Sequence, residues 1–228
     1  MKRHGMVKKL GLAALALTTV AGVALWNGSR DAGQTQLPPM AAAAQETGAA
    51  QTTAAVEDMS MGAEDAPVTI VEYASFTCPH CANFEKEVLT PLKRDYIDTG
   101  KVRFTFREVY FDRYGLWAAM VARCGGEMRY FGIADLIFEQ QKEWVTNDPA
   151  QVATNLRKIG KTAGLDDAAL DACMNDQAKA EAMVAAFQKN SQADDITATP
   201  SLIINGTKHS NMSYEELKKI IDAELAKG

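Results

Sequence analysis

Short apolar runs rich in β-branched residues alternate with segments of helical periodicity along this chain of 228 residues. Residues 68–73 form such a run, which is typical of a strand. Apolar side chains then recur at positions 81, 84, 88, 92 and 96, which predicts a helix that is kinked at Pro91 and ends near Ile97. Residues 101–109 alternate again in the manner of a strand. The order strand, helix, strand predicts a parallel pair of strands with a right-handed crossover.

The rest of the chain beyond residue 110 divides into a helical block and a short strand–turn–strand–helix ending. Asn205-Gly206 is a strong hairpin signal between strands at 201–204 and 207–209. Ser213 and Glu216 form a capping box for a last helix over 214–225. A short edge strand is expected within 57–62. Helices are expected near 116–124, 131–144, 149–162, 166–174 and 179–191, with no strand pattern over 116–192.

The amino-terminal quarter has a different composition. Basic residues at the start are followed by an apolar run over 10–26, which is typical of an export signal. We expect residues 1–26 to be a signal peptide or a membrane anchor, since the run is close to the length of a short membrane span. Residues 27–56 have almost no large apolar side chains and are expected to be a flexible linker. The folded domain is expected over 57–228.

The charge of the chain excludes one class of function. Its formal net charge is −5, with 24 basic and 29 acidic residues. The sequence has no stripe of basic residues that could neutralise phosphates, so nucleic acid is not an expected partner.

The reactive feature is Cys78-Pro79-His80-Cys81, which lies where the strand over 68–73 meets the first turn of the next helix. A cysteine there lies beside unpaired backbone N–H groups and the positive end of the helix dipole, which both favour a thiolate. Pro79 suits the first helical turn. His80 can stabilise the thiolate further, and Cys81 is within reach of Cys78. The pattern indicates a redox-active dithiol whose disulfide is readily given away.

Cys-Pro-His-Cys directly after a strand resembles the active-site motif of the DsbA family of thiol oxidases, which have a thioredoxin-like fold. A second match is Thr199-Pro200, where this superfamily has a cis-proline opposite the CxxC motif. A third match is Glu72, six residues before Cys78, where DsbA proteins have a buried acid. The resemblance implies a thioredoxin-like α/β fold in which 116–192 is an inserted all-helical domain that forms one wall of the groove over Cys78.

The resemblance also implies an activity. The chain would be a protein disulfide oxidoreductase that introduces disulfide bonds into unfolded or reduced exported proteins of the periplasm, through a mixed disulfide with Cys78. Thr199 and Pro200 would pair with the client in an extended conformation. Glu72 would relay the proton that Cys81 loses. Re-oxidation would require a DsbB-like quinone oxidoreductase of the membrane, because no flavin or nucleotide motif occurs and no cofactor is expected.

Cys124 and Cys173 both lie in the helical block. An even number of cysteines in an exported chain favours pairing, so a second, structural disulfide between them is expected. The alternative is two buried free cysteines that act as small apolar side chains.

The same residues permit other interpretations. A disulfide isomerase or reductase has the same fold, and Thr199 before Pro200 departs from the valine that is common in DsbA proteins. A docking module would hold copper or zinc with the CxxC motif and His209. Structural zinc needs about four ligands, and no second CxxC motif occurs, so no metal site is expected. Glu72 could also face solvent, and Pro200 could be a trans turn proline, because buried carboxylates and cis bonds are uncommon.

Overall fold

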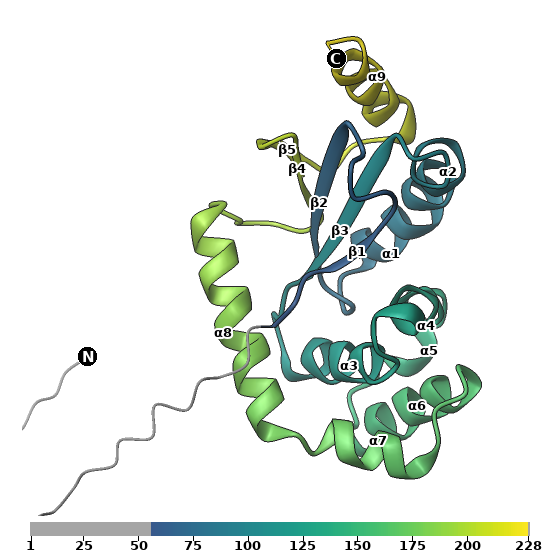
Figure 1. The fold of residues 1–228 in the computed structure, drawn as a ribbon. Helices are drawn as coiled ribbons and strands as arrows, with labels where there is room; N and C mark the ends of the chain where they lie inside the picture. Colours follow the sequence, from purple (N-terminus) through teal and green to yellow (C-terminus); the bar gives the residue numbers. More distant parts are fainter. Residues whose placement is uncertain (1–55, 228) are drawn as a thin grey trace, which may run out of the picture. The chain divides into compact units, whose positions relative to one another are not determined.

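The computed structural model of the protein describes residues 56–227. The expected signal or anchor at 1–26, and the expected linker at 27–56 except for its last residue, lie outside the described residues. Within the part that is described, no helix is both long and apolar enough to cross a membrane. The fold consists of one sheet with helices on both faces and a helical insertion (Figure 1).

A mixed sheet of five strands in the order β1-β3-β2-β4-β5 lies at the centre of the fold. β2 and β3 are parallel, as predicted for the strand–helix–strand unit, and the other neighbouring pairs are antiparallel. The predicted strands are confirmed, with ends shifted by at most two residues. Their bounds are β1 (Met59–Met61), β2 (Val68–Ala74), β3 (Val102–Glu108), β4 (Ser201–Ile204) and β5 (Thr207–Ser210).

The helix that carries the CxxC motif ends at Ile97 as predicted, but it is not α-helical throughout. In a π-helical turn an N–H bonds to the carbonyl five residues earlier, and the Thr90 N–H bonds to Glu85 O in this way. Pro91, which has no N–H, lies between two π-helical segments. The sequence predicted a kink there, whereas the structure changes the helical pitch on both sides of the proline. The segments are α1 (Pro79–Phe84), η1 (Glu85–Leu89), α2 (Thr90–Leu92) and η2 (Lys93–Ile97).

The helical insertion extends from Arg113 to Ala193, slightly beyond the predicted limits of 116–192. The single helix predicted at 131–144 is wrong: the helix begins earlier, breaks at Gln140 and resumes. Figure 1 shows α8 on one side of the sheet and α1 and α2 on the other. The insertion contains α3 (Arg113–Cys124), α4 (Glu127–Glu139), α5 (Gln141–Trp144), α6 (Pro149–Thr162), α7 (Asp167–Met174) and α8 (Gln177–Ala193).

The last helix, α9 (Tyr214–Leu225), has the predicted bounds and the predicted capping box. The Ser213 N–H donates to Glu216 Oε2 at 2.9 Å, and the Glu216 N–H donates to Ser213 Oγ at 3.4 Å. These two bonds satisfy donors that a helix start leaves free.

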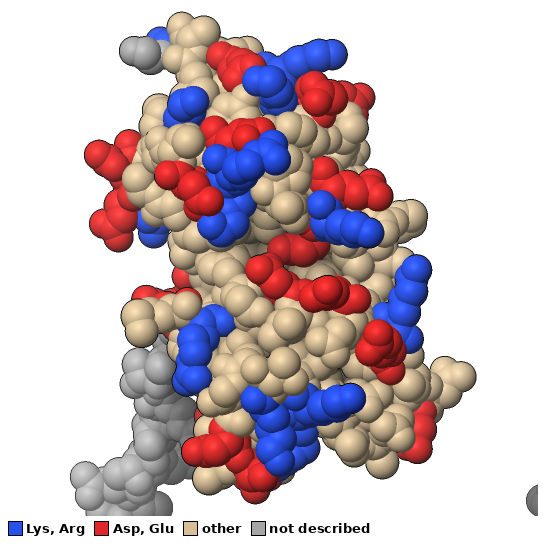
Figure 2. Space-filling model, turned by 90° about the vertical axis from the view of Figure 1, so that its right-hand side faces the viewer, with Lys and Arg blue, Asp and Glu red and all other residues tan. Residues whose placement is uncertain are grey.

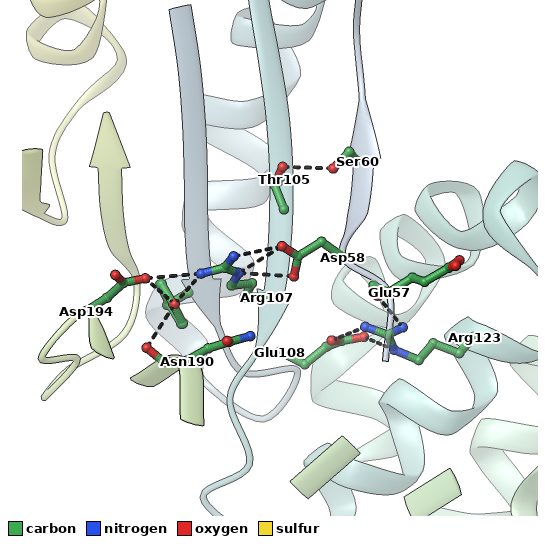
Figure 3. A network of polar contacts seen from close by, with 10 residues as sticks. Glu57, Asp58, Ser60, Thr105, Arg107, Glu108, Arg123, Asn190 and Asp194 are labelled. Carbon is green, nitrogen blue, oxygen red and sulfur yellow. Dashed lines mark hydrogen bonds and ion pairs between the residues drawn. The ribbon is translucent and has the colours of Figure 1, made fainter. Parts of the chain in front are cut away.

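Arg107 on β3 ties the sheet to the end of α8 (Figure 3). It donates to Asp58 Oδ2 at 2.8 Å, to the Tyr73 hydroxyl at 2.7 Å and to Asp194 Oδ2 at 3.1 Å. The Tyr73 hydroxyl in turn donates to Asp194, and Asn190 O is a second acceptor within its reach at 3.2 Å. Because α8 leads directly into the segment with Thr199 and Pro200, this cluster fixes the approach of that segment to the sheet.

A second ion pair ties α3 and α4 to β3, also seen in Figure 3. Arg123 donates two hydrogen bonds of 2.7 Å to the Glu108 carboxylate, and their side chains are only 6% and 5% exposed. The Tyr130 hydroxyl donates to Glu108 at 2.8 Å, and Arg123 also donates to Glu57 O at 3.0 Å. Removal of one partner from a buried ion pair of this kind costs much free energy, because the other charge is left buried and unpaired.

Cys124 and Cys173 form a disulfide, with their Cα atoms 5.8 Å apart. Cys124 is the last residue of α3, and Cys173 is the last but one of α7. The structure thus has the expected pairing in place of the two free cysteines of the alternative. The bond joins two helices of the insertion across 49 positions of sequence.

Candidate active site

Cys78 is the N-cap residue of α1, with extended backbone angles of φ −85° and ψ 118°. Its N–H donates to Ser75 O at 3.0 Å, and its carbonyl accepts from Cys81 N at 3.1 Å and from Ala82 N at 3.2 Å. Its side chain caps no N–H group of the helix, and Pro79 occupies the first turn as predicted. The Cys78 sulfur therefore lies at the positive end of the helix, where a thiolate is favoured.

The two thiols of the motif have opposite environments. Cys78 and Cys81 are both free; Cys78 is half-buried, whereas Cys81 is fully buried. A hydrogen bond from the Cys81 thiol lowers the pKa of Cys78 to about 5, against the opposing effect of partial burial. The Thr199 side chain and the backbone N–H groups of Cys81 and His80 lower it further. The pKa of Cys81 is raised, because its thiol donates to Cys78 and because it is buried near Glu72.

The peptide bond between Thr199 and Pro200 is cis, and it lies beside Cys78. The Cys78 sulfur is 3.7 Å from Thr199 O. β4 begins at the next residue, Ser201, which pairs with Tyr73 on β2, and Ser201 Oγ donates to Ala198 O at 2.7 Å. These bonds hold the backbone of residues 198–200 against the reactive sulfur. Cys78 and Thr199 are 121 residues apart in sequence.

Glu72 on β2 is 1% exposed, so it does not face solvent as the alternative allowed. Its Oε2 atom is buried and has no hydrogen-bond partner among the described residues. Burial, with a smaller contribution from the negative charge of Cys78, raises the pKa of Glu72 to about 8. A carboxyl with this pKa can both hold and release a proton near neutral pH.

Two further carboxyl groups, Glu85 on η1 and Asp135 on α4, were not predicted from the sequence. Burial, the charge of Glu72 and a hydrogen bond with Asp135 raise the pKa of Glu85 well above its ordinary value. Both residues line a groove of about 720 Å³, which also borders Pro79 and Gln141. Figure 2 views the molecule from the right-hand side of Figure 1, where α1, α2 and α4 lie, and shows acidic side chains gathered across the middle of that face. No spacing in the sequence relates residues on three separate elements, so no local signal could have identified this group.

Gln141 is a second residue that sequence reasoning missed. It is 6% exposed, and its Nε2 donates to Phe76 O at 2.8 Å and to Cys78 O at 3.0 Å. On the other side of the loop, Thr77 Oγ1 donates to Asp112 Oδ2 at 2.8 Å. The helical insertion therefore contacts the strand–helix junction from α5 and from the start of α3. Partners more than 30 residues away leave no pattern in the sequence.

The two histidines named from the sequence are not among the buried residues of the site. His80 is exposed on the first turn of α1. His209 is on the edge strand β5, opposite Leu202. In residues 56–227, no group of three or more histidine, cysteine or acidic side chains is arranged to hold a metal ion.

Comparison with known proteins agrees with this geometry. The family model described as thioredoxin matches residues 54–223. A Rickettsia bellii relative, named as a protein-disulfide oxidoreductase, is 33% identical over 170 residues, which cover 74% of this chain and 64% of the relative. The chain thus spans less than two thirds of that relative's length. Disulfide bond formation protein D of Bacillus subtilis is 28% identical over 183 residues, which cover 72% of this chain and 76% of that protein.

Among solved structures, Wolbachia pipientis alpha-DsbA1 is similar with a TM-score of 0.71 and 30% sequence identity. The match covers 75% of this chain and 92% of that one. BdbD from Bacillus subtilis is similar with a TM-score of 0.67 and 25% identity. The family model, these relatives and the arrangement of Cys78, Cys81 and Pro200 agree, and the chain belongs to the DsbA family within the thioredoxin superfamily.

Proposed function

We propose that this chain is a thiol:disulfide oxidoreductase that introduces disulfide bonds into exported proteins through the Cys78–Cys81 pair. One observation carries the proposal: Cys78 is a half-exposed N-cap cysteine whose pKa is lowered to about 5, and it is paired with a fully buried Cys81. A stable Cys78 thiolate favours the reduced enzyme, which makes the enzyme disulfide an oxidant. The names of the relatives support the same reaction class.

The reaction starts from the oxidised enzyme. A client thiolate attacks the Cys78 sulfur, the bond between Cys78 and Cys81 breaks, and Cys81 leaves with the electron pair. Glu72, which is mostly protonated at neutral pH, supplies the proton that neutralises Cys81. The product of this step is a mixed disulfide between Cys78 and the client.

A second client thiolate then attacks the client sulfur of the mixed disulfide. The bond to Cys78 breaks, and Cys78 leaves as the thiolate that its surroundings stabilise. The client has lost two electrons and two protons, and the enzyme has gained two electrons. On re-oxidation, Cys81 must lose its proton, and the Glu72 carboxylate is the buried base nearby. A DsbB-like quinone oxidoreductase of the membrane is the partner we propose for this step.

Thr199 and Pro200 are the proposed client contact. The Thr199 carbonyl lies 3.7 Å from the Cys78 sulfur, ahead of the point where β4 begins. An extended client segment could pair with this backbone and present its cysteine to Cys78, a form of strand addition. We propose the periplasm as the compartment, on the basis of this client class and of the signal peptide or membrane anchor expected at 1–26.

A trapping experiment tests the mechanism. In a Cys81→Ala variant, the Cys78 thiolate can attack a peptide whose single cysteine is activated as a disulfide with a thiol of low pKa. That thiol leaves, and neither Cys81 nor a second peptide thiol is present to release the product. We expect a covalent adduct of one peptide per chain, seen by intact mass, and none with Cys78→Ala. Absence of the adduct would contradict the proposed mixed disulfide.

A disulfide isomerase or reductase is the second candidate, because Thr199 precedes the cis-proline where DsbA proteins commonly have valine. Refolding of a client with scrambled disulfides separates the two functions. An isomerase in the dithiol form accelerates this refolding. An oxidase in the disulfide form instead oxidises the reduced client and is itself reduced to the dithiol.

A further inference from the structure

We propose that Gln141 is a positioning residue through which the helical insertion sets the redox equilibrium of the Cys78–Cys81 pair. The inference rests on the proposed function and extends it, because it assigns the insertion a part in the chemistry beyond forming a wall for the client. We call residues 75–78, which connect β2 to α1, the redox loop.

The side-chain hydrogen bonds of Gln141 go to the redox loop. A side-chain amide has two N–H donors, and both carbonyls within reach of Nε2 belong to this loop: Phe76 O at 2.8 Å and Cys78 O at 3.0 Å. Gln141 is 6% exposed, so water does not readily replace these bonds. Its position as the first residue of α5 aims the side chain at the loop.

The two carbonyls have different roles. Phe76 is 1% exposed, and among residues 56–227 Gln141 is the donor that bonds to its carbonyl. The Cys78 carbonyl also accepts from Cys81 N and Ala82 N, so it is the group at which α1 begins. Gln141 therefore holds the carbonyl that orients the first turn of α1, including the N–H groups that stabilise the Cys78 thiolate.

The opposite side of the redox loop is held by α3. Asp112 caps α3 with Oδ1 and accepts from Thr77 Oγ1 with Oδ2. Gly115 lies so close beneath the loop that a Cβ atom there would be 3.2 Å from Ser75 Oγ. With this side fixed, loss of the Gln141 bonds leaves the Phe76 and Cys78 carbonyls as the part of the loop that can move. That movement directly changes the surroundings of the Cys78 sulfur.

The experiment compares two variants that each remove side-chain hydrogen bonds, among them one made to or from α5. Gln141→Met keeps a side chain of similar length but no donor. Asn155→Ala is the matched control, since Asn155 Nδ2 donates to Glu143 O at 3.1 Å and its Oδ1 accepts from Gln151 Nε2, so neither bond involves the redox loop. Each variant is equilibrated with glutathione buffers to measure the redox equilibrium of the Cys78–Cys81 pair. The pKa of Cys78 is measured from the absorbance of its thiolate as the pH is lowered from alkaline to acid. Thermal unfolding is measured on the same samples.

We expect Gln141→Met to raise the Cys78 pKa by about one unit and to lower the equilibrium constant for oxidation of glutathione about tenfold, or about 30 mV. Asn155→Ala should lower the unfolding temperature and leave both redox quantities within twofold of wild type. Equal redox changes in both variants, or a Gln141→Met variant that changes only in unfolding temperature, would overturn the proposal.

A measurement on the unmodified protein covers the case in which Gln141→Met does not fold. The side-chain amide protons of Gln141 should exchange with solvent far more slowly than those of the exposed Gln151, as NMR can detect. Equally fast exchange would refute the contacts on which the inference depends. An unmodified protein with an ordinary Cys78 pKa but a protected Gln141 would instead contradict the proposed function, so the two failures are distinguishable.

Discussion

The two cysteine pairs of this chain lie at opposite ends of helices. Cys78 is the N-cap of α1, next to free N–H groups and the positive end of the helix dipole. Cys124 ends α3, and Cys173 is in the last turn of α7, so both are at the negative end of a helix. A thiolate is favoured in the first position and disfavoured in the second. Helix polarity therefore favours a thiolate, and so a reactive disulfide, at Cys78, and adds to the hydrogen bond from Cys81; at Cys124 and Cys173 it favours a stable cross-link.

The residues around each cysteine pair add to the effect of the helix ends on thiolate stability. Cys78 faces the cis Thr199–Pro200 bond, and Cys81 lies near Glu72, a carboxyl group whose pKa burial raises to about 8. Arg123, the charged residue beside Cys124, is already engaged with Glu108. α3 connects the two regions, since its cap Asp112 bonds to the redox loop and its last residue is Cys124.

Loss of the Cys78 sulfur should have the largest effect. We expect Cys78→Ser to abolish oxidation of a reduced peptide with two cysteines, because no other free thiolate is at a helix start. The matched variant Cys124→Ala/Cys173→Ala should keep activity within about twofold of wild type at a temperature where it is folded. Activity that survives in Cys78→Ser would contradict the contrast between the pairs.

Glu72 should make stability depend on pH. Its folded pKa of about 8 is above the ordinary value of 4.5, so the folded state loses stability as pH rises from 4.5 to 8. Glu72→Gln should therefore equal wild type at pH 4 and exceed it above pH 8 by at most about 5 kcal/mol. Urea unfolding of the reduced proteins at both pH values measures this, because the charge of the Cys78 thiolate contributes to the raised pKa. A constant difference at all pH values would show that Glu72 titrates normally.

Removal of the second disulfide should affect stability and leave the redox site intact. For a cross-link across 49 positions, chain entropy predicts a loss of about 4 kcal/mol in the free energy of unfolding. Denaturant unfolding of Cys124→Ala/Cys173→Ala tests this value. A changed reduction potential of Cys78–Cys81 in this variant would show that the two regions are coupled more tightly than the contrast allows.

The smallest effect is expected at Asp112. Asp112→Ala removes the cap of α3 and should cost about 1 kcal/mol in the free energy of unfolding. Asp112→Asn keeps a capping oxygen and should cost much less. Equal losses in both variants would mean that the negative charge, and not the cap, is what the residue contributes.

Local patterns predicted much of the fold. The helices at 149–162 and 214–225 and the strand at 201–204 were predicted to the residue, since capping residues and the Asn205-Gly206 turn are signals within a few positions. The start of α3 was missed because Asp112 was not recognised as its cap. The break at Gln140 was not predicted, because no glycine or proline lies beside it in the sequence.

The site was predictable only in part, for a related reason. Cys78, Cys81 and Pro200 belong to motifs that a reader can recognise in the sequence. Gln141, Glu85 and Asp135 act through partners that the fold brings near from other elements. Contacts of this kind depend on how the insertion packs on the sheet, which no short pattern encodes.

The reduction potential of the Cys78–Cys81 pair, measured by equilibration with glutathione, tests the central claim most directly. A low Cys78 pKa stabilises the reduced form, so we predict a potential above about −180 mV, more oxidising than the glutathione couple. A potential near about −270 mV, the range of a thioredoxin-like reductase, would contradict the proposal that this protein donates disulfides.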